Sequence, residues 1–308
     1  MRVLPGPTKS NQVLAWSPDG RWLVAGGSGD GIMVWDVDAN APGRRIFATA
    51  HGGKLMRFCR TNERLYVAFQ SGGVWDWNPG TDEERLHPWS DRYHRYYGFT
   101  LADHGRAAAL NTFRESPTGA GVESQDVGYA ITADGLTVER WARPNGHNWN
   151  SSHSFAFRCG SDELFGIGSH AGGTQFVRVR TTDGALLGSF DPPGAVRSWV
   201  LAPDDSRVAW VSEHGLHVRD FEPGAPALEL PAAGGEHRRG LAWSPDSRLI
   251  SYTTGTTVRL LDAGTLSEVR ALDWNIGKPR AVAFHPDGLR AAVSGEGGRG
   301  WVTVFDLE

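Results

Sequence analysis

Ala15-Trp16-Ser17-Pro18-Asp19-Gly20 is a six-residue stretch that returns, in related form, three more times along the 308-residue chain. The related versions stand at Leu201–Asp205, Ala242–Ser247 and Ala283–Gly288. In each version a large apolar residue ends an apolar run and is followed by Pro and Asp, which favour a tight turn. Recurrence of one strand-and-turn unit predicts a repeat architecture, because a single unit cannot bury its apolar face alone.

The period of the repeat is measured between the large apolar residues that precede each turn. These residues are Trp16, Phe58, Phe99, Phe157, Leu201, Trp243 and Phe284. They are separated by 42, 41, 58, 44, 42 and 41 residues, and an insertion between Phe113 and Val127 accounts for the one long spacing. Seven units therefore fill the chain as one domain, 1–308. We predict them over approximately residues 10–48, 54–87, 95–142, 153–191, 196–232, 239–274 and 280–307, with residues 2–5 added to the last.

Each unit has the pattern of four short strands. In the first unit, strands are expected over residues 12–17, 22–26, 32–37 and 44–48. The inner strands are almost wholly apolar, as in Val208–Val211, and such runs favour strands that are covered on both faces. Helical periodicity is absent over any useful length, and 40 Gly with 17 Pro disfavour helices. The expected fold is therefore all-β.

A residue pair that ends in Asp or Asn follows most of the expected third strands. The pairs are Trp35-Asp36, Trp75-Asp76, Trp77-Asn78, Arg219-Asp220, Leu261-Asp262 and Phe305-Asp306. The chain thereby resembles the WD-repeat (tryptophan-aspartate repeat) β-propeller family along essentially its whole length. The resemblance implies a closed seven-bladed β-propeller of four-stranded antiparallel blades, with the N-terminal strand completing the last blade. Closure of this kind removes an exposed sheet edge.

Blades of this family carry a buried hydrogen-bond network of His, Ser or Thr, Asp and Trp, and the match here is partial. The resemblance implies such a structural network at two places, formed by Ser28, Asp30 and Trp35 in the first unit and by His51, Ser71 and Trp77 in the second. The third to fifth units have lost the Trp. Because these networks are structural, their loss indicates blades that are held mainly by apolar packing.

Composition limits the class of partner. The net charge of −4 and the pI near 6.3 give no general electrostatic attraction to a nucleic-acid backbone. The first residues contain no apolar signal-peptide core, and no run of 18 apolar residues free of charge occurs. We therefore expect a cytoplasmic protein with no nucleic-acid and no membrane partner.

Two expected loops are unusually rich in aromatic, basic and amide side chains. They cover residues 87–97 and 143–153, on either side of the third unit, and the implied topology brings both to one face together with the insertion. Tyr, Trp and Arg are enriched where proteins bind tightly, because they bury a large area and keep a polar group. An alternative is that some of these aromatic side chains only cap blades. The candidate partner-binding residues are Trp89, Arg92, Tyr93, His94, Arg95, His147, Asn148 and Trp149.

The sequence predicts no catalytic, metal or cofactor site. The histidines of the two loops lack the spacing of a zinc motif. The Ser-Pro-Asp triplets at Ser17 and Ser244 are explained by their turns. We therefore expect a non-catalytic scaffold that binds a protein or peptide of unknown identity through the loop-rich face. Alternatives that stay open are a small-ligand (metabolite or sugar) binding protein and a propeller enzyme with a site at the central channel. A structural scaffold without a specific partner surface, or a fragment whose function needs another chain, also stays open.

Overall fold

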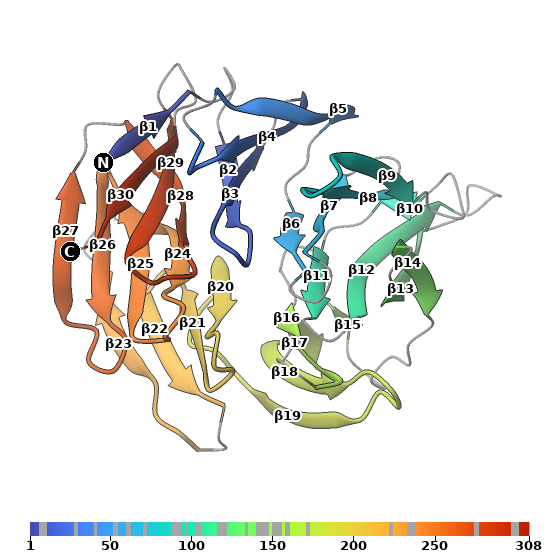
Figure 1. Ribbon diagram of the computed structural model, residues 1–308. Coiled ribbons are helices and arrows are strands. Elements are labelled where there is room, and N and C mark those ends of the chain that lie inside the picture. The colour runs from blue at the N-terminus through green and yellow to red at the C-terminus, as the bar shows by residue number, and fades with distance from the viewer. Residues whose placement is uncertain are drawn as a thin grey trace. The chain divides into compact units, whose positions relative to one another are not determined.

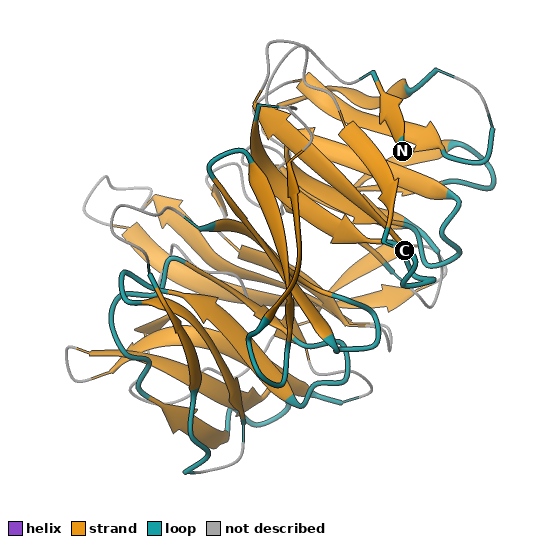
Figure 2. Ribbon diagram, turned by 90° about the vertical axis from the view of Figure 1, so that its left-hand side faces the viewer, coloured by secondary structure: helices purple, strands orange, loops and turns teal. Residues whose placement is uncertain are grey.

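Strands and the turns between them make up the computed structural model (Figure 1). The residues that it describes are 1–5, 11–27, 30–39, 42–51, 55–59, 63–69, 73–87, 94–95, 98–102, 106–115, 122–132, 135–139, 148–149, 156–157, 161–170, 173–221, 224–232, 238–273, 277–296 and 302–307. From residue 94 to residue 149 it describes the course of the strands but not their side chains. No helix occurs among the described residues (Figure 2), so the all-β prediction is confirmed.

The chain divides into two compact units, and the first consists of Met1–Phe58 and Val196–Glu308. Its described strands form four antiparallel sheets of four strands each. The sheets are β2 (Asn11–Trp16), β3 (Trp22–Gly27), β4 (Asp30–Asp36) and β5 (Arg44–His51); β20 (Ser198–Leu201), β21 (Arg207–Val211), β22 (Gly215–Asp220) and β23 (Leu228–Pro231); β24 (Arg239–Trp243), β25 (Leu249–Thr254), β26 (Thr257–Asp262) and β27 (Glu268–Asp273); and β28 (Lys278–Phe284), β29 (Arg290–Glu296) and β30 (Val302–Asp306) with β1 (Arg2–Leu4).

The second unit consists of Cys59–Ala195. The sheet order β6 (Leu55–Phe58), β7 (Leu65–Phe69), β8 (Gly73–Asn78) and β9 (Glu83–His87) starts at the boundary between the units. Two further sheets follow it, one made of β10 (His94–Arg95), β11 (Gly98–Ala102), β12 (Arg106–Glu115), β13 (Val122–Thr132) and β14 (Gly135–Glu139), the other of β15 (Asn148–Trp149), β16 (Ala156–Phe157), β17 (Glu163–His170), β18 (Gly173–Arg180) and β19 (Leu186–Phe190).

The architecture of a β-propeller with four-stranded antiparallel blades is thereby confirmed. Six of the sheets are described with side chains, and the sheet of β10–β14 is described by its strand pairing alone. The closed ring of seven blades and the blade limits predicted from the repeat stay predictions.

The N-terminal strand completes the last sheet, as predicted. Strand β1 pairs antiparallel with β30, so that Arg2 lies opposite Val304 and Leu4 opposite Val302. The same segment also contacts the first sheet, because the Arg2 guanidinium donates to the carbonyls of Val37 and Ala39. Residues 1–5 therefore join the last sheet of the chain to the first.

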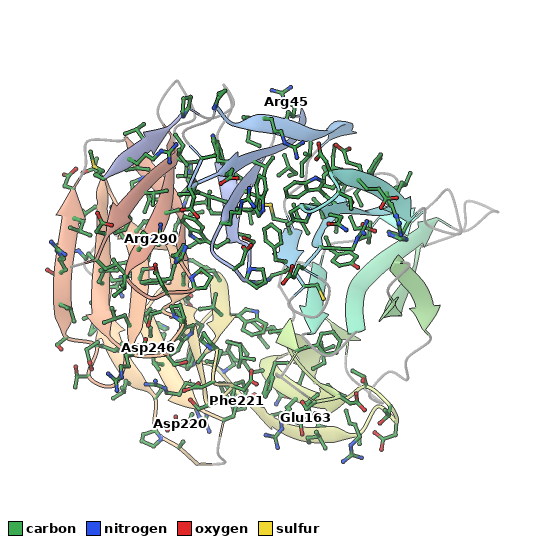
Figure 3. The ribbon with its side chains drawn as sticks, in the orientation of Figure 1. Arg45, Glu163, Asp220, Phe221, Asp246 and Arg290 are labelled. Carbon is green, nitrogen blue, oxygen red and sulfur yellow. The ribbon has the colours of Figure 1, made fainter. Side chains whose placement is uncertain are left out.

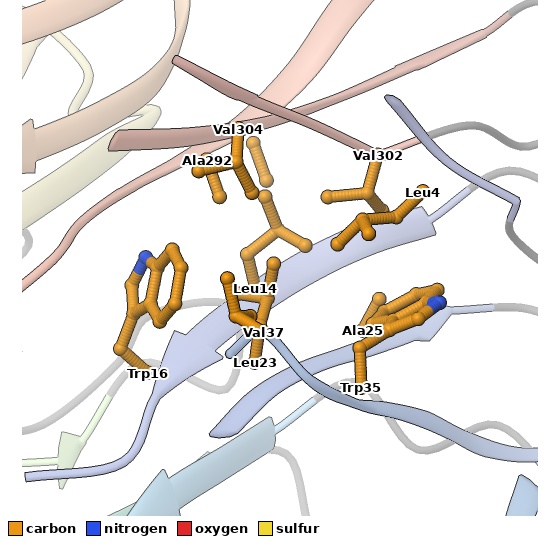
Figure 4. Packing of buried hydrophobic residues seen from close by; sticks show 11 residues of the cluster. Leu4, Leu14, Trp16, Leu23, Ala25, Trp35, Val37, Ala292, Val302 and Val304 are labelled. Atoms are coloured by element: carbon orange, nitrogen blue, oxygen red, sulfur yellow. The ribbon is translucent and has the colours of Figure 1, made fainter. Parts of the chain in front are cut away.

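Apolar side chains of the first and last sheets form one core. Leu4 lies beside Val302, while Leu14, Leu23 and Val37 fill the middle of the cluster (Figure 4). Trp16 lies at one end of it and its indole Nε1 donates to the carbonyl of Ala283, at 3.1 Å. The neighbouring sheets thus bury apolar faces that neither would cover alone.

The same inter-sheet hydrogen bond occurs at the equivalent position elsewhere in the first unit. Trp243, which ends β24 as Trp16 ends β2, donates from Nε1 to the carbonyl of Val200 in β20, at 3.2 Å. In both cases the acceptor lies one residue before the large apolar residue of the preceding sheet. The repeated Trp therefore fixes how one sheet is placed on the next.

The repeated turns also share one backbone conformation. The fourth residue after the large apolar residue has a left-handed φ in all four, namely 75° at Gly20, 57° at Asp205, 59° at Ser247 and 74° at Gly288. Only glycine adopts this region without strain, so two of the four turns carry strain that the other two avoid. The recurring turn sequence thus corresponds to one required backbone conformation, a left-handed residue at the same position of each turn.

Candidate partner-binding surface

The sheets on either side of the two unusual loops have a first strand in two pieces. Strands β10 and β11 both pair with β12, opposite residues 113–114 and 106–110 respectively. Strands β15 and β16 both pair with β17, opposite residues 168–169 and 164–165. Strand β10 thus lies at the end of β12 that leads into β13, and β15 lies at the end of β17 that leads into β18.

The predicted insertion is an extension of a hairpin. Strands β12 and β13 have 10 and 11 residues and pair as far as Glu115 opposite Val122. The register shifts between Ala109 and Thr112, so the extension begins at a β-bulge. Strand β10 pairs with this extended part, so the additional residues carry a strand that the regular blades lack.

Strands β11 and β16, the second pieces of the two split strands, lie next to each other within the second unit. Strands β10 and β15 lie at corresponding ends of these adjacent sheets. The shared face of the two loops stays a prediction. We call the strands β10 and β15 the split-strand rim. The adjoining segments 88–93 and 140–147 lie outside the described residues.

The candidate residues fall into two groups. His94 and Arg95 form β10, opposite Arg114 and Phe113, while Asn148 and Trp149 form β15. The other four lie outside the described residues: Trp89, Arg92, Tyr93 and His147. The assignment of a partner to these residues stays a prediction.

His87, which begins the first of the unusual loops, belongs to a buried charge cluster instead. Its Nε2 contacts one carboxylate oxygen of Asp76, and the Arg64 guanidinium contacts the other. The side chains of Arg64 and Asp76 are only 5% and 0% exposed. A carboxylate oxygen of Glu83 lies 3.8 Å from the Arg64 guanidinium. Buried charges persist when they are paired, so His87 has a structural partner here.

This cluster was missed in the sequence because its members are up to 23 positions apart and look unrelated. One signal was present, since Asp76 is the Asp of a Trp-Asp pair at the end of a third strand. Strand register explains the rest, because His87 ends β9 beside β8, and Arg64 directly precedes β7 on the other side.

The two described Trp residues of the expected structural networks use their donors elsewhere. Trp35 Nε1 donates to the carbonyl of Pro5 at 3.2 Å, and Trp77 Nε1 donates to Asp82 at 2.8 Å. Strand pairing places Asp30 opposite His51 across β4 and β5. The side chains of Ser28, Asp30, His51 and Ser71 lie outside the described part, and the networks that would include them stay predictions.

A Ser–His pair lies in the sheet of β20–β23. Ser212 Oγ is 2.9 Å from His217 Nε2, and His217 stacks on Trp210 with ring centroids 5.0 Å apart. Ser212 and His217 are 3% and 0% exposed. Burial lowers the pKa of His217, so the ring is neutral at pH 7. A nucleophile must reach its substrate, and this pair is enclosed by its own sheet, so its arrangement is that of a core hydrogen bond.

Within the described residues, no group of three or more His, Cys, Asp or Glu side chains is arranged to hold a metal ion. The described residues likewise include no apolar helix long enough to span a bilayer.

Comparison with known proteins identifies the repeat and the fold. Residues 1–36 match the family model of the WD domain, G-beta repeat. No curated protein sequence matches the chain. Among solved structures 1509 chains are similar, so the fold alone does not specify a function.

One of the similar structures is the β-propeller domain of Cps50 (Swd1) from Myceliophteria thermophila. It has a TM-score of 0.77 and 13% sequence identity, and the match covers 100% of both chains. At this identity the likeness concerns the fold. The resemblance to the WD-repeat β-propeller family is thereby confirmed, in sequence by a WD repeat over residues 1–36 and in structure by the propeller fold.

Proposed function

We propose that this protein is a non-catalytic scaffold that holds a protein or peptide partner on the split-strand rim. In this proposal the sheets form a closed seven-bladed ring in which β1 completes the last blade. The WD-repeat propeller fold typically serves protein interaction, which supports this class of function. The proposed compartment is the cytoplasm.

The observation that carries the proposal is the departure of two adjacent sheets from the regular blade. Both have a split first strand at corresponding ends, and the separate pieces carry His94-Arg95 and Asn148-Trp149. Irregular strand ends on a regular scaffold are where binding residues are usually found. The aromatic and basic residue types at this place are those enriched in protein interfaces.

Stacked sheets also favour association on energetic grounds. A binding surface loses less conformational entropy when its loops are already held by packed strands. The strands around the rim are so held, because β12 and β13 pair along most of their length. The strands β10 and β15, which are paired with β12 and β17, would therefore need little ordering when a partner binds.

The test is affinity purification from the native cell followed by mass spectrometry. The variant carries Trp89→Ala, Arg92→Ala and Trp149→Ala. The matched control carries Arg45→Ala, Val269→Ala and Leu289→Ala, of which Val269 and Leu289 are 58% and 53% exposed apolar residues elsewhere on the chain. The proposal expects loss of specific partners from the first variant alone. Unchanged partners in both variants, with both proteins folded, would refute the assignment of the rim.

A further inference from the structure

One outer strand of the described sheets lacks the residues that usually protect an exposed sheet edge. Each sheet ends in an outer strand, and these strands are β1, β5, β9, β14, β19, β23 and β27. Edge strands of natural proteins commonly carry charged residues or Pro, because an unprotected edge pairs with other chains. Every outer strand except β19 contains at least one charged residue. Strand β19 has the sequence Leu-Leu-Gly-Ser-Phe, with neither charge nor Pro.

The edge of β19 is accessible. Leu186 is 46% exposed, and Gly188 and Ser189 are exposed as well. Among the described strands only β18 pairs with β19, which lies at the end of its sheet (Figure 1). The register shifts at Leu187, and residues 188–190 then pair with β18 in regular register. On the other side, the backbone of this regular part is therefore left for a further strand.

Gly188 leaves a gap in the row of side chains on one face of β19. A Cβ placed at Gly188 would meet no atom within 4 Å. Phe190, two positions further on the same face, stacks on Phe176 with ring centroids 4.9 Å apart. A large side chain on a neighbouring strand stabilises an edge glycine by covering it. The gap therefore favours a large apolar residue opposite Gly188.

A carboxylate stands directly after β19. Asp191 is exposed, and no cationic group among the described residues contacts it. Asp183, in the turn before β19, differs because Arg180 Nη1 lies 2.7 Å from its carboxylate. Opposite charges on facing positions of two strands attract each other. Asp191 therefore favours a basic residue in an added strand, three positions from the residue opposite Gly188.

A second copy of β19 fits this edge less well than a segment of another protein. In an antiparallel pair centred on Gly188, this glycine would face Gly188 of the other copy, so the gap would stay open. Asp191 would face Ala185, which carries no charge. A strand of five residues also buries far less than the roughly 1,000 Å² expected of a stable interface between two folded proteins. The occupant that fits is a short extended segment.

We propose that β19 takes up an extended segment of the protein partner as an additional strand. The segment carries a large apolar residue opposite Gly188 and a basic residue beside Asp191. This inference rests on the proposed scaffold function and names the chemistry of the partner. Strand β19 belongs to the same sheet as β15 of the split-strand rim, so the added strand extends a sheet already assigned to the partner. In this mode main-chain hydrogen bonds give affinity, and side chains at alternate positions give specificity.

The experiment measures binding of a fluorescein-labelled heptapeptide by fluorescence anisotropy. The probe has Phe in the centre, Val on both sides of it, then Thr, and Lys at both ends. Its symmetry places a Lys three positions from Phe in either strand direction. Two further forms carry N-methyl groups on both Val or on both Thr. Successive residues of a strand direct their N–H groups to opposite sides, so only one of these two forms loses the hydrogen bonds to β19.

Two protein variants, each with a matched control, test the two side-chain contacts in the full chain. Gly188→Lys fills the gap and adds a charge to the edge; Gly188 has no left-handed φ, so the backbone accepts the change. Its control is Ala271→Lys, which adds the same charge to the exposed outer strand β27. Asp191→Asn removes the carboxylate, and its control is Asp220→Asn at the exposed end of β22 (Figure 3).

The proposal expects the natural chain and both controls to bind the probe alike, within twofold. Gly188→Lys should weaken binding at least tenfold. Asp191→Asn should weaken it about two- to fivefold, since an exposed ion pair contributes little. One methylated form should bind at least tenfold more weakly than the other. Circular dichroism of all variants is expected to match that of the natural chain, because the substituted positions are exposed.

Absence of binding to the natural chain, or equal affinity of Gly188→Lys and Ala271→Lys, would overturn the proposal. Equal affinity of the two methylated forms would overturn the added strand, and equal affinity of Asp191→Asn and Asp220→Asn would overturn the basic contact. A dimer of the natural chain in sedimentation that Gly188→Lys abolishes would overturn it in favour of a second copy.

Affinity purification separates this inference from the proposed function. If Trp89→Ala, Arg92→Ala and Trp149→Ala together abolish partner capture but the natural chain does not bind the probe, the scaffold stands and the added strand fails. If the probe is bound and those substitutions leave the captured partners unchanged, the added strand stands and the assignment of the split-strand rim fails.

Discussion

Replacement of Gly20 by Ala is the most informative single substitution at the seam between the first and last sheets. Gly20 and Gly288 occupy the same position of the repeated turn, with φ values of 75° and 74°. A Cβ at Gly20 would lie 2.2 Å from Nε2 of His285, whereas a Cβ at Gly288 would have no atom within 4 Å. The two positions thus share backbone strain and differ in steric contact, so Gly288→Ala is the matched control.

The magnitudes follow from the contacts. A left-handed Ala costs about 1–2 kcal/mol, and the less flexible unfolded chain returns about 0.4–1 kcal/mol. Gly288→Ala should therefore lower the free energy of unfolding by about 1 kcal/mol. Gly20→Ala must also displace the His285 ring, which contacts the Gly20 carbonyl at 2.9 Å and meets Trp16 edge to face at 4.6 Å between centroids.

Loss of that hydrogen bond costs about 1 kcal/mol and loss of the ring contact about 0.5–1.5 kcal/mol. Gly20→Ala should thus lower the free energy of unfolding by about 2.5–3.5 kcal/mol in total. Urea unfolding followed by tryptophan fluorescence measures both variants against the natural chain. Equal destabilisation of the two variants would refute the packing of His285 on the Gly20 turn.

Three further predictions concern groups that the structure buries. Burial lowers the pKa of His217, so the native ring stays neutral while the unfolded ring takes up a proton below about pH 6.5. The free energy of unfolding should therefore rise as pH increases from 5 to 6.5. His217→Gln should reduce this rise, which is measured by urea unfolding at several pH values. The same dependence of the free energy of unfolding on pH in both proteins would contradict the prediction. Asp76→Asn leaves the charge of Arg64 buried without its carboxylate, so it should lower the free energy of unfolding by about 3–5 kcal/mol. The double variant Arg64→Met with Asp76→Leu removes both charges and should lower it less. A larger loss in the double variant, measured by urea unfolding, would contradict the ion pair. Trp243→Phe removes the hydrogen bond to the Val200 carbonyl and should lower the free energy of unfolding by about 1–2 kcal/mol. Thermal unfolding beside the natural chain measures the loss, and equal melting temperatures would contradict the role of this bond.

Much of the fold could be predicted from the sequence because its information is local. The turn letters specify a left-handed residue four places after Trp16 and its equivalents, and the apolar runs specify strands on either side. The pairing of Arg2–Leu4 with β30 was predictable for a similar reason, since the last unit has only three strands of its own.

The irregular features depend on tertiary structure and were not predictable. The split of one strand into β10 and β11 requires the register of β12, which shifts at a bulge. The Arg64–Asp76–His87 cluster requires three strands to be side by side. Interactions of this kind do not recur from unit to unit, so the alignment of the repeats gives no sign of them.

The central claim is that residues 1–5 hold the last sheet to the first. These residues contribute the β1–β30 pairing, the buried Leu4 at 2% exposure and the bond from Trp35 to the Pro5 carbonyl. Burial of Leu4 alone contributes about 1.5–3 kcal/mol. Thermal unfolding of the chain 6–308 beside the full chain tests the claim directly. The account predicts a clearly lower melting temperature for the shortened protein, and equal melting temperatures would contradict it.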